Sequence, residues 1–318
     1  MKKTVDVIVP VYQPGKKFSR LLQMLSKQTW PIRRIIVMNT ERSYWNEEGY
    51  RGIPGLEVHH LTKEEFDHGA TRDLAAWYAE ADIMVFMTDD AVPQDNYLIE
   101  RLAEALSWTG KNGETVAMAY ARQLPDKDCR LIERYTRSFN YPSKSSVKTA
   151  ADLERLGIKT YFASNACCAY DRRIYEKLDG FINRAIFNED MIFAAEVIKH
   201  GYGIAYAADA LVIHSHNYTG PQQFRRNFDL AVSQADHPEV FGGISSEGEG
   251  IRLVRKTASY LMKTGRVWLL PELVYKSGCK YAGYRLGKRY KILPEKVILS
   301  CTMNQEYWKK AKKRGKSK

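Results

Sequence analysis

The chain has 318 residues, 44% of them hydrophobic and 12% aromatic, which allows a substantial core and excludes a disordered chain. No run of about 18 apolar residues occurs, so no membrane-spanning helix is expected. The lysines and short apolar run at the N-terminus are interrupted by Asp6, and no small-residue cleavage site follows. This start therefore predicts a first core strand and not a signal peptide.

The net charge of +12 is unevenly distributed. From residue 251 onward 19 Lys and Arg face three Glu, a balance of +16, so residues 1–250 carry −4. A basic segment of this kind can bind nucleic acid or an anionic membrane, and the simpler alternative is a solvated helical surface that ends in a frayed tail, residues 309–318.

Five cysteines are present, an odd number without the spacing of metal ligands. We expect all five to be reduced, which indicates a cytoplasmic protein. They are Cys129, Cys167, Cys168, Cys279 and Cys301.

Apolar periodicity predicts alternating strands and helices in the first part of the chain. Strands are expected at residues 5–12, 33–40, 56–62, 82–88 and 116–124, and helices at residues 18–28, 71–81 and 97–106. The polar residues 126–160 are expected to form a long loop. This alternation predicts an α/β domain with a mostly parallel central sheet and helices on both faces.

The later part of the chain continues the pattern and then changes. We expect a strand at 161–170, a helix at 188–202, two strands within 203–216 and a helix at 224–235. After Gly250 the pattern is helical, with many aromatic and basic residues. We therefore expect one domain over residues 1–240 and a helical, basic, aromatic-rich extension over residues 250–318.

Two adjacent carboxylates, Asp89 and Asp90, end the expected strand 82–88 in the stretch "VFMTDDAVP". Aspartates are common at helix caps and in turns, so a purely structural role is one interpretation. The other is a metal site, since Mg²⁺ is usually held by one or two carboxylates together with substrate phosphates. Ligands bind beyond the carboxyl ends of strands in such sheets, and these two residues lie at one of those ends.

Two further groups have both a structural and a chemical interpretation. Glu189 and Asp190 open the expected helix 188–202, where acids are favoured by the helix dipole. His214 and His216 are spaced two residues apart, so on a strand they share one face. Neither GxGxxG nor GxxxxGK[ST] nor GxSxG occurs, which argues against a dinucleotide-binding fold, a P-loop ATPase and an α/β-hydrolase.

Eight stretches occur in a characteristic order: "VIVPVYQPG", "FDHGATRDLAA", "FMTDDAVP", "ARQLP", "FNYPS", "GIKTYFASNACCAY", "NEDMIFAAEVIKHGYGIAYAADALVIHSHNY" and "FRRNFD". Each is weak alone, but the ordered set closely resembles the bacterial rhamnosyltransferase-like branch of glycosyltransferase family 2, over about residues 4–235. The resemblance implies a GT-A fold, a nucleotide-diphosphate sugar donor, a divalent metal (Mg²⁺ or Mn²⁺) and an inverting reaction. It assigns residues 1–240 to the catalytic domain.

The resemblance also implies roles for the acids and histidines. Asp90 is the expected metal ligand, in an element where Thr88 replaces the usual first Asp, with His214 and then His216 as further ligands. A divalent cation would act as a Lewis acid on the leaving diphosphate. The family places the catalytic base in the Glu-Asp pair, here Asp190, with Glu189 as the second choice.

The same resemblance suggests which residues line the donor and acceptor sites. Donor-binding residues are expected to be Pro10, Val11, Tyr12, Asn39, His68, Gly69, Arg72, Asp89, Arg122 and Gln123. Acceptor- or sugar-binding residues are expected to be Asn140, Tyr141, Ser164 and Asn165. Arg225 and Arg226 could contact the diphosphate or simply face solvent.

The sequence thus favours a metal-dependent inverting transferase that moves L-rhamnose from dTDP-rhamnose to a saccharide or lipid-linked acceptor in polysaccharide synthesis. A second hypothesis keeps the fold and replaces the sugar donor with UDP-glucose, a galactose donor or an N-acetylglucosamine donor. A third is a non-catalytic basic protein that binds membrane or nucleic acid, although no nucleic-acid-binding motif occurs. Residues 251–318 could contact an anionic membrane, placing the protein at the inner face of the cell membrane, or could form a homo-oligomer.

Overall fold

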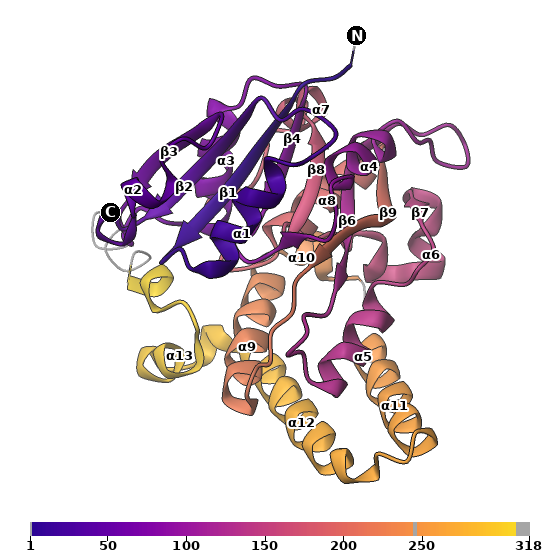
Figure 1. Ribbon diagram of the computed structural model, residues 1–318. Coiled ribbons are helices and arrows are strands. Elements are labelled where there is room, and N and C mark those ends of the chain that lie inside the picture. Colours follow the sequence, from indigo (N-terminus) through magenta and orange to yellow (C-terminus); the bar gives the residue numbers. More distant parts are fainter. Residues whose placement is uncertain (1, 244–246, 310–318) are drawn as a thin grey trace. The chain divides into compact units, whose positions relative to one another are not determined.

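The contacts within the chain define two compact units (Figure 1). The computed structural model describes residues 2–243 and 247–309, so the tail expected at residues 309–318 lies outside this part except for Lys309. The first unit contains the residues up to Asp126, Tyr141–Asn183 and Glu189–His214. The second contains Lys127–Asn140, Arg184–Asn188 and the residues from Ser215 on.

The first unit is built on one mixed sheet with the strand order β3-β2-β1-β4-β8-β6-β9-β5, and β7 pairs with β9. Strands β3, β2, β1 and β4 are parallel neighbours, whereas β8 runs antiparallel to both β4 and β6. The strands are β1 Val5–Tyr12, β2 Arg34–Thr40, β3 Leu56–Leu61, β4 Ile83–Met87, β5 Val92–Pro93, β6 Val116–Leu124, β7 Ser146–Lys148, β8 Cys167–Asp171 and β9 Gly203–Ile213.

Helices cover both faces of this sheet, as the apolar alternation predicted. Alternate residues of a strand point to opposite faces. One face of β1 and β4 packs with Phe18 of α1 and Leu98 of α4 in one core cluster. On the other face Phe86 contacts Phe181, which in turn packs against Phe193 of α8. The helices are α1 Lys16–Leu25, α2 Glu47–Tyr50, α3 His68–Tyr78, α4 Leu98–Ala105, α6 Leu153–Leu156, α7 Arg172–Lys177 and α8 Glu189–Lys199.

The prediction of a long loop at residues 126–160 is wrong. This stretch forms helix α5 (Leu131–Asn140), strand β7, a short 3-10 turn and α6. Tyr135 of α5 stacks on Tyr260 with ring centroids 4.5 Å apart, and Thr149 and Asp152 form a reciprocal capping box. The segment is polar because its elements are short and bury little apolar surface. Its structure is therefore stabilised by helix caps and tertiary contacts, which the apolar periodicity of the sequence does not reveal.

Two strand expectations also need correction. Within residues 203–216 there is a single strand, β9 (Gly203–Ile213), because an irregular register against β6 between Ala121 and Arg122 absorbs the polar interruption at Asp209. In residues 161–170 the strand begins only at Cys167. The preceding Ser164 and Asn165 therefore lie in the turn that leads into β8.

The second unit is helical, with α12 packed closely on α9. An added Cβ at Gly283 would lie 2.1 Å from the carbonyl oxygen of Phe224, and one at Gly287 would lie 2.3 Å from that of Phe228. The two backbones are therefore in direct contact, and α9 lies in the same compact unit as these helices. The remaining helices are α9 Gly220–Asp236, α10 Pro238–Phe241, α11 Glu247–Lys263, α12 Leu270–Gly287 and α13 Glu295–Cys301. Within the described residues, none of the helices has the length and apolar character needed to cross a membrane.

We predict that Gly283→Ala destabilises the protein by about 1–3 kcal/mol, because its methyl group would overlap the backbone of α9. Gly278→Ala is the matched control, since it lies in the same helix and has no atom within 4 Å of an added Cβ. That control should leave stability unchanged or raise it by up to about 1 kcal/mol. Urea unfolding of the three proteins measures the difference, and equal midpoints would contradict the close approach.

Candidate active site

The carboxyl ends of the parallel strands β1, β2 and β4 meet at one edge of the sheet, where Tyr12, Thr40 and Thr88 lie. Asp89 and Asp90 follow β4 directly. Burial raises the pKa of Asp89 to about 6, with a further contribution from the charge of Asp90, while the backbone N–H of Tyr12 acts in the opposite direction. The carboxyl group of Asp89 thus links the end of β4 to the end of β1.

His214 follows β9 and lies beside Asp90. Its Nε2 is 3.3 Å from Asp90 Oδ1, and its Nδ1 is 2.9 Å from Gln123 Oε1. Because an amide oxygen only accepts hydrogen bonds, Nδ1 carries the proton that is donated to Gln123. In a neutral imidazole with this hydrogen bond, Nε2 on the side of Asp90 is the nitrogen that could bind a metal.

The expected metal ligands are close together. A carboxylate oxygen of Asp90 and ring nitrogens of His214 and His216 all lie within 4.8 Å of one another. A carboxylate and two imidazoles form a donor set suited to a divalent transition metal, and one carboxylate with phosphate oxygens also suits Mg²⁺. The residues therefore fit a divalent cation.

Gln123 also connects this pair to the turn before β8, because its Nε2 donates to Ser164 Oγ at 2.9 Å. The next residue, Asn165, is held by Tyr170, whose hydroxyl donates to the Asn165 side-chain oxygen at 2.7 Å. The backbone N–H of Asn165 in turn donates to Asp190 Oδ2 at 3.0 Å. One turn is thus linked to the histidine through Gln123 and is bonded directly to the acid predicted to be the base.

Glu189 and Asp190 begin α8 and are in different environments. Arg72 Nη1 lies 3.1 Å from Glu189 Oε1, and both side chains are buried. Burial opposes ionisation of Glu189, but the Arg72 guanidinium prevails and lowers the pKa of this carboxyl. Burial and the neighbouring charge of Glu189 raise the pKa of Asp190 to about 7. The pair therefore contains one fixed, ion-paired carboxylate and one that can gain and lose a proton near neutral pH.

The ends of β1 and β2 present aromatic and polar groups. The exposed Tyr12 ring packs edge-on against Tyr44 at 5.5 Å, and Lys63 Nζ lies 5.0 Å from the Tyr12 ring centroid. Asn39 is fully buried and donates from Nδ2 to the carbonyl of Glu41, with His60 Nδ1 at 3.0 Å from the same nitrogen. The exposed Tyr12 ring, which contacts both the Tyr44 ring and the Lys63 ammonium group, could stack on a nucleotide base.

Several buried polar atoms at this edge have no hydrogen-bond partner within the described residues. Such atoms are uncommon in folded proteins and indicate a missing ligand, ion or water. They are Asn39 Oδ1, Thr40 Oγ1, Arg72 Nε, Thr88 Oγ1 and Arg122 Nε. Their position at the ends of β2, β4 and β6 and in α3 is consistent with a polar ligand beyond the sheet.

Other predicted residues make local contacts within the first unit. Gly69 lies in the first turn of α3, where its N–H is bonded by the side chain of Asp67, and His68 packs edge-on against Phe66. Tyr141 is buried against Phe162. Pro10 and Val11 lie in β1, and Val11 is buried.

In the second unit, Asn140 ends α5 and is exposed. The Arg226 guanidinium lies 4.6 Å from the Phe187 ring centroid, whereas Arg225 is exposed. These positions leave the expected binding roles untested.

Sequence reasoning missed three contacts. It did not assign Gln123 as the partner of His214, Arg72 as the partner of Glu189, or Tyr170 as the support of Asn165. The first two contacts join residues far apart in the chain, and the third joins a strand residue to the turn five residues before it, so local periodicity indicates none of them. Tyr44 and Lys63 follow the ends of β2 and β3, and the strand-end rule could have identified them.

A model of the family described as "Glycosyl transferase family 2" matches residues 6–179. This chain belongs to glycosyl transferase family 2. The family and enzyme class expected from the ordered motifs are thus confirmed, and so is the fold. The matched part of this transferase includes Asp90 and Arg72, while His214 and Asp190 follow beyond it.

Curated relatives cover almost the whole of this glycosyltransferase. It is 36% identical over 308 residues to the O-antigen chain rhamnosyltransferase RfbN of Salmonella typhimurium, covering 96% of each chain. It is 35% identical over 310 residues to the O-antigen chain rhamnosyltransferase WbaN of Salmonella anatum, covering 95% of each.

Solved structures show the same fold at low identity. The mannosyltransferase PcManGT of Pyrobaculum calidifontis, solved with GDP-Man and Mn²⁺, has a TM-score of 0.54 at 17% identity, over 99% of this chain and 87% of its own. TarS of S. aureus has a TM-score of 0.52 at 17% identity, over 91% of each chain. At this identity the likeness is evidence for the fold only.

We predict that Arg72→Met lowers the free energy of unfolding by about 3–5 kcal/mol, because it leaves the buried Glu189 carboxylate without its partner. The double variant Arg72→Met with Glu189→Gln should recover part of the loss. Arg51→Met is the control, because its ion pair with Glu48 is exposed and worth at most about 1 kcal/mol. Denaturant unfolding tests this, and a loss no larger than the control's would contradict it.

Proposed function

We propose that this glycosyltransferase moves L-rhamnose from dTDP-rhamnose to a saccharide or lipid-linked acceptor during synthesis of a cell-surface polysaccharide. The observation that carries the proposal is the 36% identity to an O-antigen chain rhamnosyltransferase over 96% of each chain. Identity spread over the whole length includes both donor and acceptor regions, so it favours the same class of sugar. The alternative keeps the chemistry and replaces the donor, and the donor panel below separates the two.

Asp90, His214 and His216 would hold a divalent cation, Mg²⁺ or Mn²⁺. When bound, the cation would neutralise charge on the leaving diphosphate as a Lewis acid. Support comes from the donor atoms within 4.8 Å and from the hydrogen bond that fixes the His214 tautomer. The structural neighbour PcManGT was solved with Mn²⁺, which favours the same class of ion here.

Asp190 is the proposed general base. The acceptor oxygen attacks C1 of the sugar, the bond from C1 to the diphosphate oxygen breaks, and the acceptor proton passes to the Asp190 carboxylate. One displacement inverts the configuration at C1. Glu189 is less suited to this step, because its carboxylate is paired with Arg72 and bonded by Asn165 Nδ2 at 3.3 Å.

The binding roles of the remaining residues stay predictions. Tyr12 and Asn39 are proposed to contact the base, Arg122 the donor, and Ser164 and Asn165 the acceptor. Contact of residues 251–318 with an anionic membrane at the inner face of the cell membrane and homo-oligomer formation also stay predictions. A nucleic-acid-binding role has no supporting observation.

We predict that dTDP-rhamnose is the donor that binds most tightly in a panel that also contains UDP-glucose, UDP-galactose and UDP-N-acetylglucosamine, each measured with Mn²⁺ or Mg²⁺. Calorimetric binding and release of free dTDP are measured together, because hydrolysis without an acceptor can be slow. Tighter binding of another nucleotide sugar would assign that sugar as the donor. A folded protein that binds none of the donors would contradict the proposed transferase activity.

Asp90→Asn should remove the dependence of donor binding on added metal, because it replaces the carboxylate ligand with a weaker amide. Asp95→Asn is the matched control, since Asp95 is an aspartate of the same unit that is bonded to Arg101 and Tyr97. Asp95→Asn should bind donor and respond to a chelator as the wild type does. Metal-dependent binding that survives in Asp90→Asn would exclude Asp90 as a ligand.

We predict that kcat/KM rises with pH through about 7, because Asp190 must be ionised to accept a proton and its pKa is raised to that range. Glu189→Gln removes the neighbouring negative charge, so the acidic limb should move to lower pH. Glu196→Gln, on the exposed side of the same helix, should leave it in place. The pH profiles of the three proteins test this, and an unchanged limb in Glu189→Gln would remove Asp190 as the titrating base.

A further inference from the structure

The turn between α11 and α12 concentrates exposed apolar side chains. We call residues 262–275 the hairpin tip. Its exposed apolar residues are Met262, Val267, Trp268, Val274 and Tyr275, and the Trp268 side chain is 69% exposed. In the first unit the large exposed apolar residues are spread over several separate elements. Five such residues within fourteen positions form a feature that folding of the second unit does not require.

The two helices that carry the hairpin tip are well anchored inside the second unit. Leu261 and Leu273, at the inner side of the turn, are buried. The glycines of α12 allow direct backbone contact with α9, and Tyr135 of α5 stacks on Tyr260 of α11. The exposed apolar residues are therefore presented by a fixed hairpin, whose turn lies at the end of the two helices in Figure 1.

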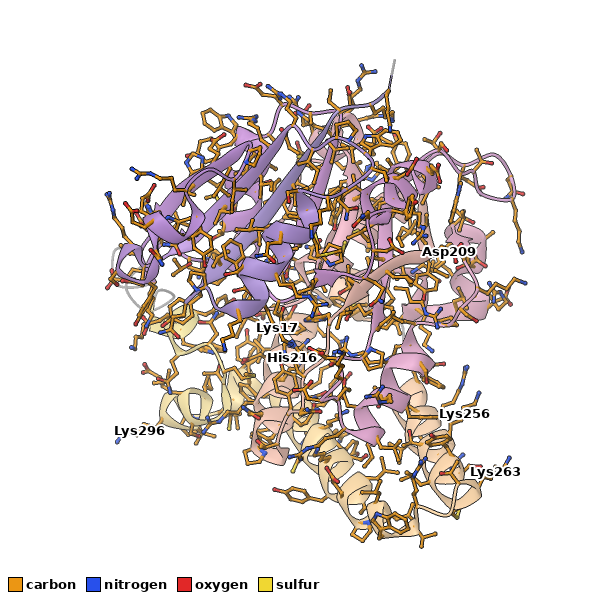
Figure 2. All side chains as sticks on the ribbon, in the orientation of Figure 1. Lys17, Asp209, His216, Lys256, Lys263 and Lys296 are labelled. Atoms are coloured by element: carbon orange, nitrogen blue, oxygen red, sulfur yellow. The ribbon has the colours of Figure 1, made fainter. Side chains whose placement is uncertain are left out.

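Basic side chains surround the hairpin tip. Lys263 is exposed at the end of α11, and Arg266 follows in the turn. Figure 2 shows Lys256 and Lys263 extending outward from α11. The acid of this stretch, Glu272, is paired with Lys276 at 2.7 Å. Over residues 255–276 five Lys and Arg face one Glu, so the stretch that contains the tip carries a formal charge of +4.

We propose that the hairpin tip is a membrane-docking element that inserts Trp268 and Val267 at the interface of an anionic lipid bilayer while Lys263 and Arg266 contact lipid phosphates. Tryptophan favours the boundary between headgroups and acyl chains, and basic residues near an anionic leaflet add attraction. Neither signal is sufficient alone, but an apolar wedge with a basic rim supplies both. This inference rests on one part of the proposed function, the placement of the protein at a membrane. It does not depend on which sugar is transferred.

Charge complementarity favours lipid over the other possible occupants. A second copy that met the tip with its own tip would bring an equally basic surface, and two such surfaces repel. An apolar protein partner would leave the surrounding lysines without a role. An anionic bilayer accepts both the rings and the charges, and no helix within residues 2–243 and 247–309 could anchor the protein by spanning it.

The test is co-sedimentation of the full chain with vesicles of phosphatidylcholine, alone or mixed with phosphatidylglycerol, without donor or acceptor. Wild type should bind the mixed vesicles, and the binding should weaken at high salt. Trp268→Ala should bind about tenfold more weakly. Lys263→Glu should bind at least about fivefold more weakly. Circular dichroism and donor binding should be unchanged in both variants.

Two matched controls distinguish vesicle binding through the hairpin tip from nonspecific adsorption of the protein. Trp77, on α3 in the first unit, is 79% exposed, so Trp77→Ala removes a more exposed tryptophan outside the tip. Lys27→Glu makes the same charge reversal at an exposed lysine of the first unit. Both controls should bind vesicles as the wild type does.

Several outcomes would overturn the inference. They are equal binding to neutral vesicles, equal losses in the Trp77 and Trp268 variants, or no vesicle binding at all. Concentration-dependent dimerisation that Trp268→Ala abolishes, without vesicle binding, would assign the hairpin tip to a second copy. None of these results bears on sugar transfer, because the donor panel is run without lipid, so the two proposals fail separately.

Discussion

The buried ion pair between Arg72 and Glu189 is the interaction on which the arrangement of the site depends. It joins α3 to α8 across the carboxyl edge of the sheet. Without the guanidinium, two adjacent carboxylates would be buried at the start of one helix, where each disfavours ionisation of the other. With it, Glu189 stays charged and structural, and Asp190 alone carries the raised pKa. One arginine thereby gives two neighbouring acids different environments, in which Glu189 is ion-paired and Asp190 is the proposed proton acceptor.

The antiparallel insertion of β8 has a comparable role for the backbone. Because β8 runs opposite to β4 and β6, its entry turn lies at the same edge as the exit of β4. Asn165 in that turn bonds Asp190, and Ser164 accepts a hydrogen bond from Gln123, which orients His214. A purely parallel sheet would place this turn at the far edge. The mixed topology therefore brings the expected metal ligands and the expected base into one hydrogen-bonded framework.

Most of the strands, and the fold family, could be predicted from the sequence because burial repeats with a fixed period and the motifs follow in order. Residues 126–160 could not, since their short elements depend on caps and distant partners such as Tyr260. In the site, the closeness of Asp90 to His214 followed from the motifs. The partners of Arg72 and Gln123 did not, because they depend on which way a side chain turns within the folded edge, and local periodicity carries no information on that.

The presence of Thr88, where the resemblance implies an acid, suggests why His214 is held by Gln123 beside Asp90. An element with one fewer carboxylate has less negative charge to hold a divalent cation, so in the proposed site neutral imidazoles would supply the remaining protein ligands. A neutral imidazole binds metal only through its unprotonated nitrogen, and a hydrogen bond from Nδ1 of His214 to Gln123 would leave Nε2, on the side of Asp90, for that role. Fewer anionic ligands also leave more of the cation's charge for a diphosphate. In the proposed site, the acid that Thr88 lacks is thus matched by the hydrogen bond that His214 donates to Gln123 of β6, which gives a reason for the burial of Gln123 beside a histidine.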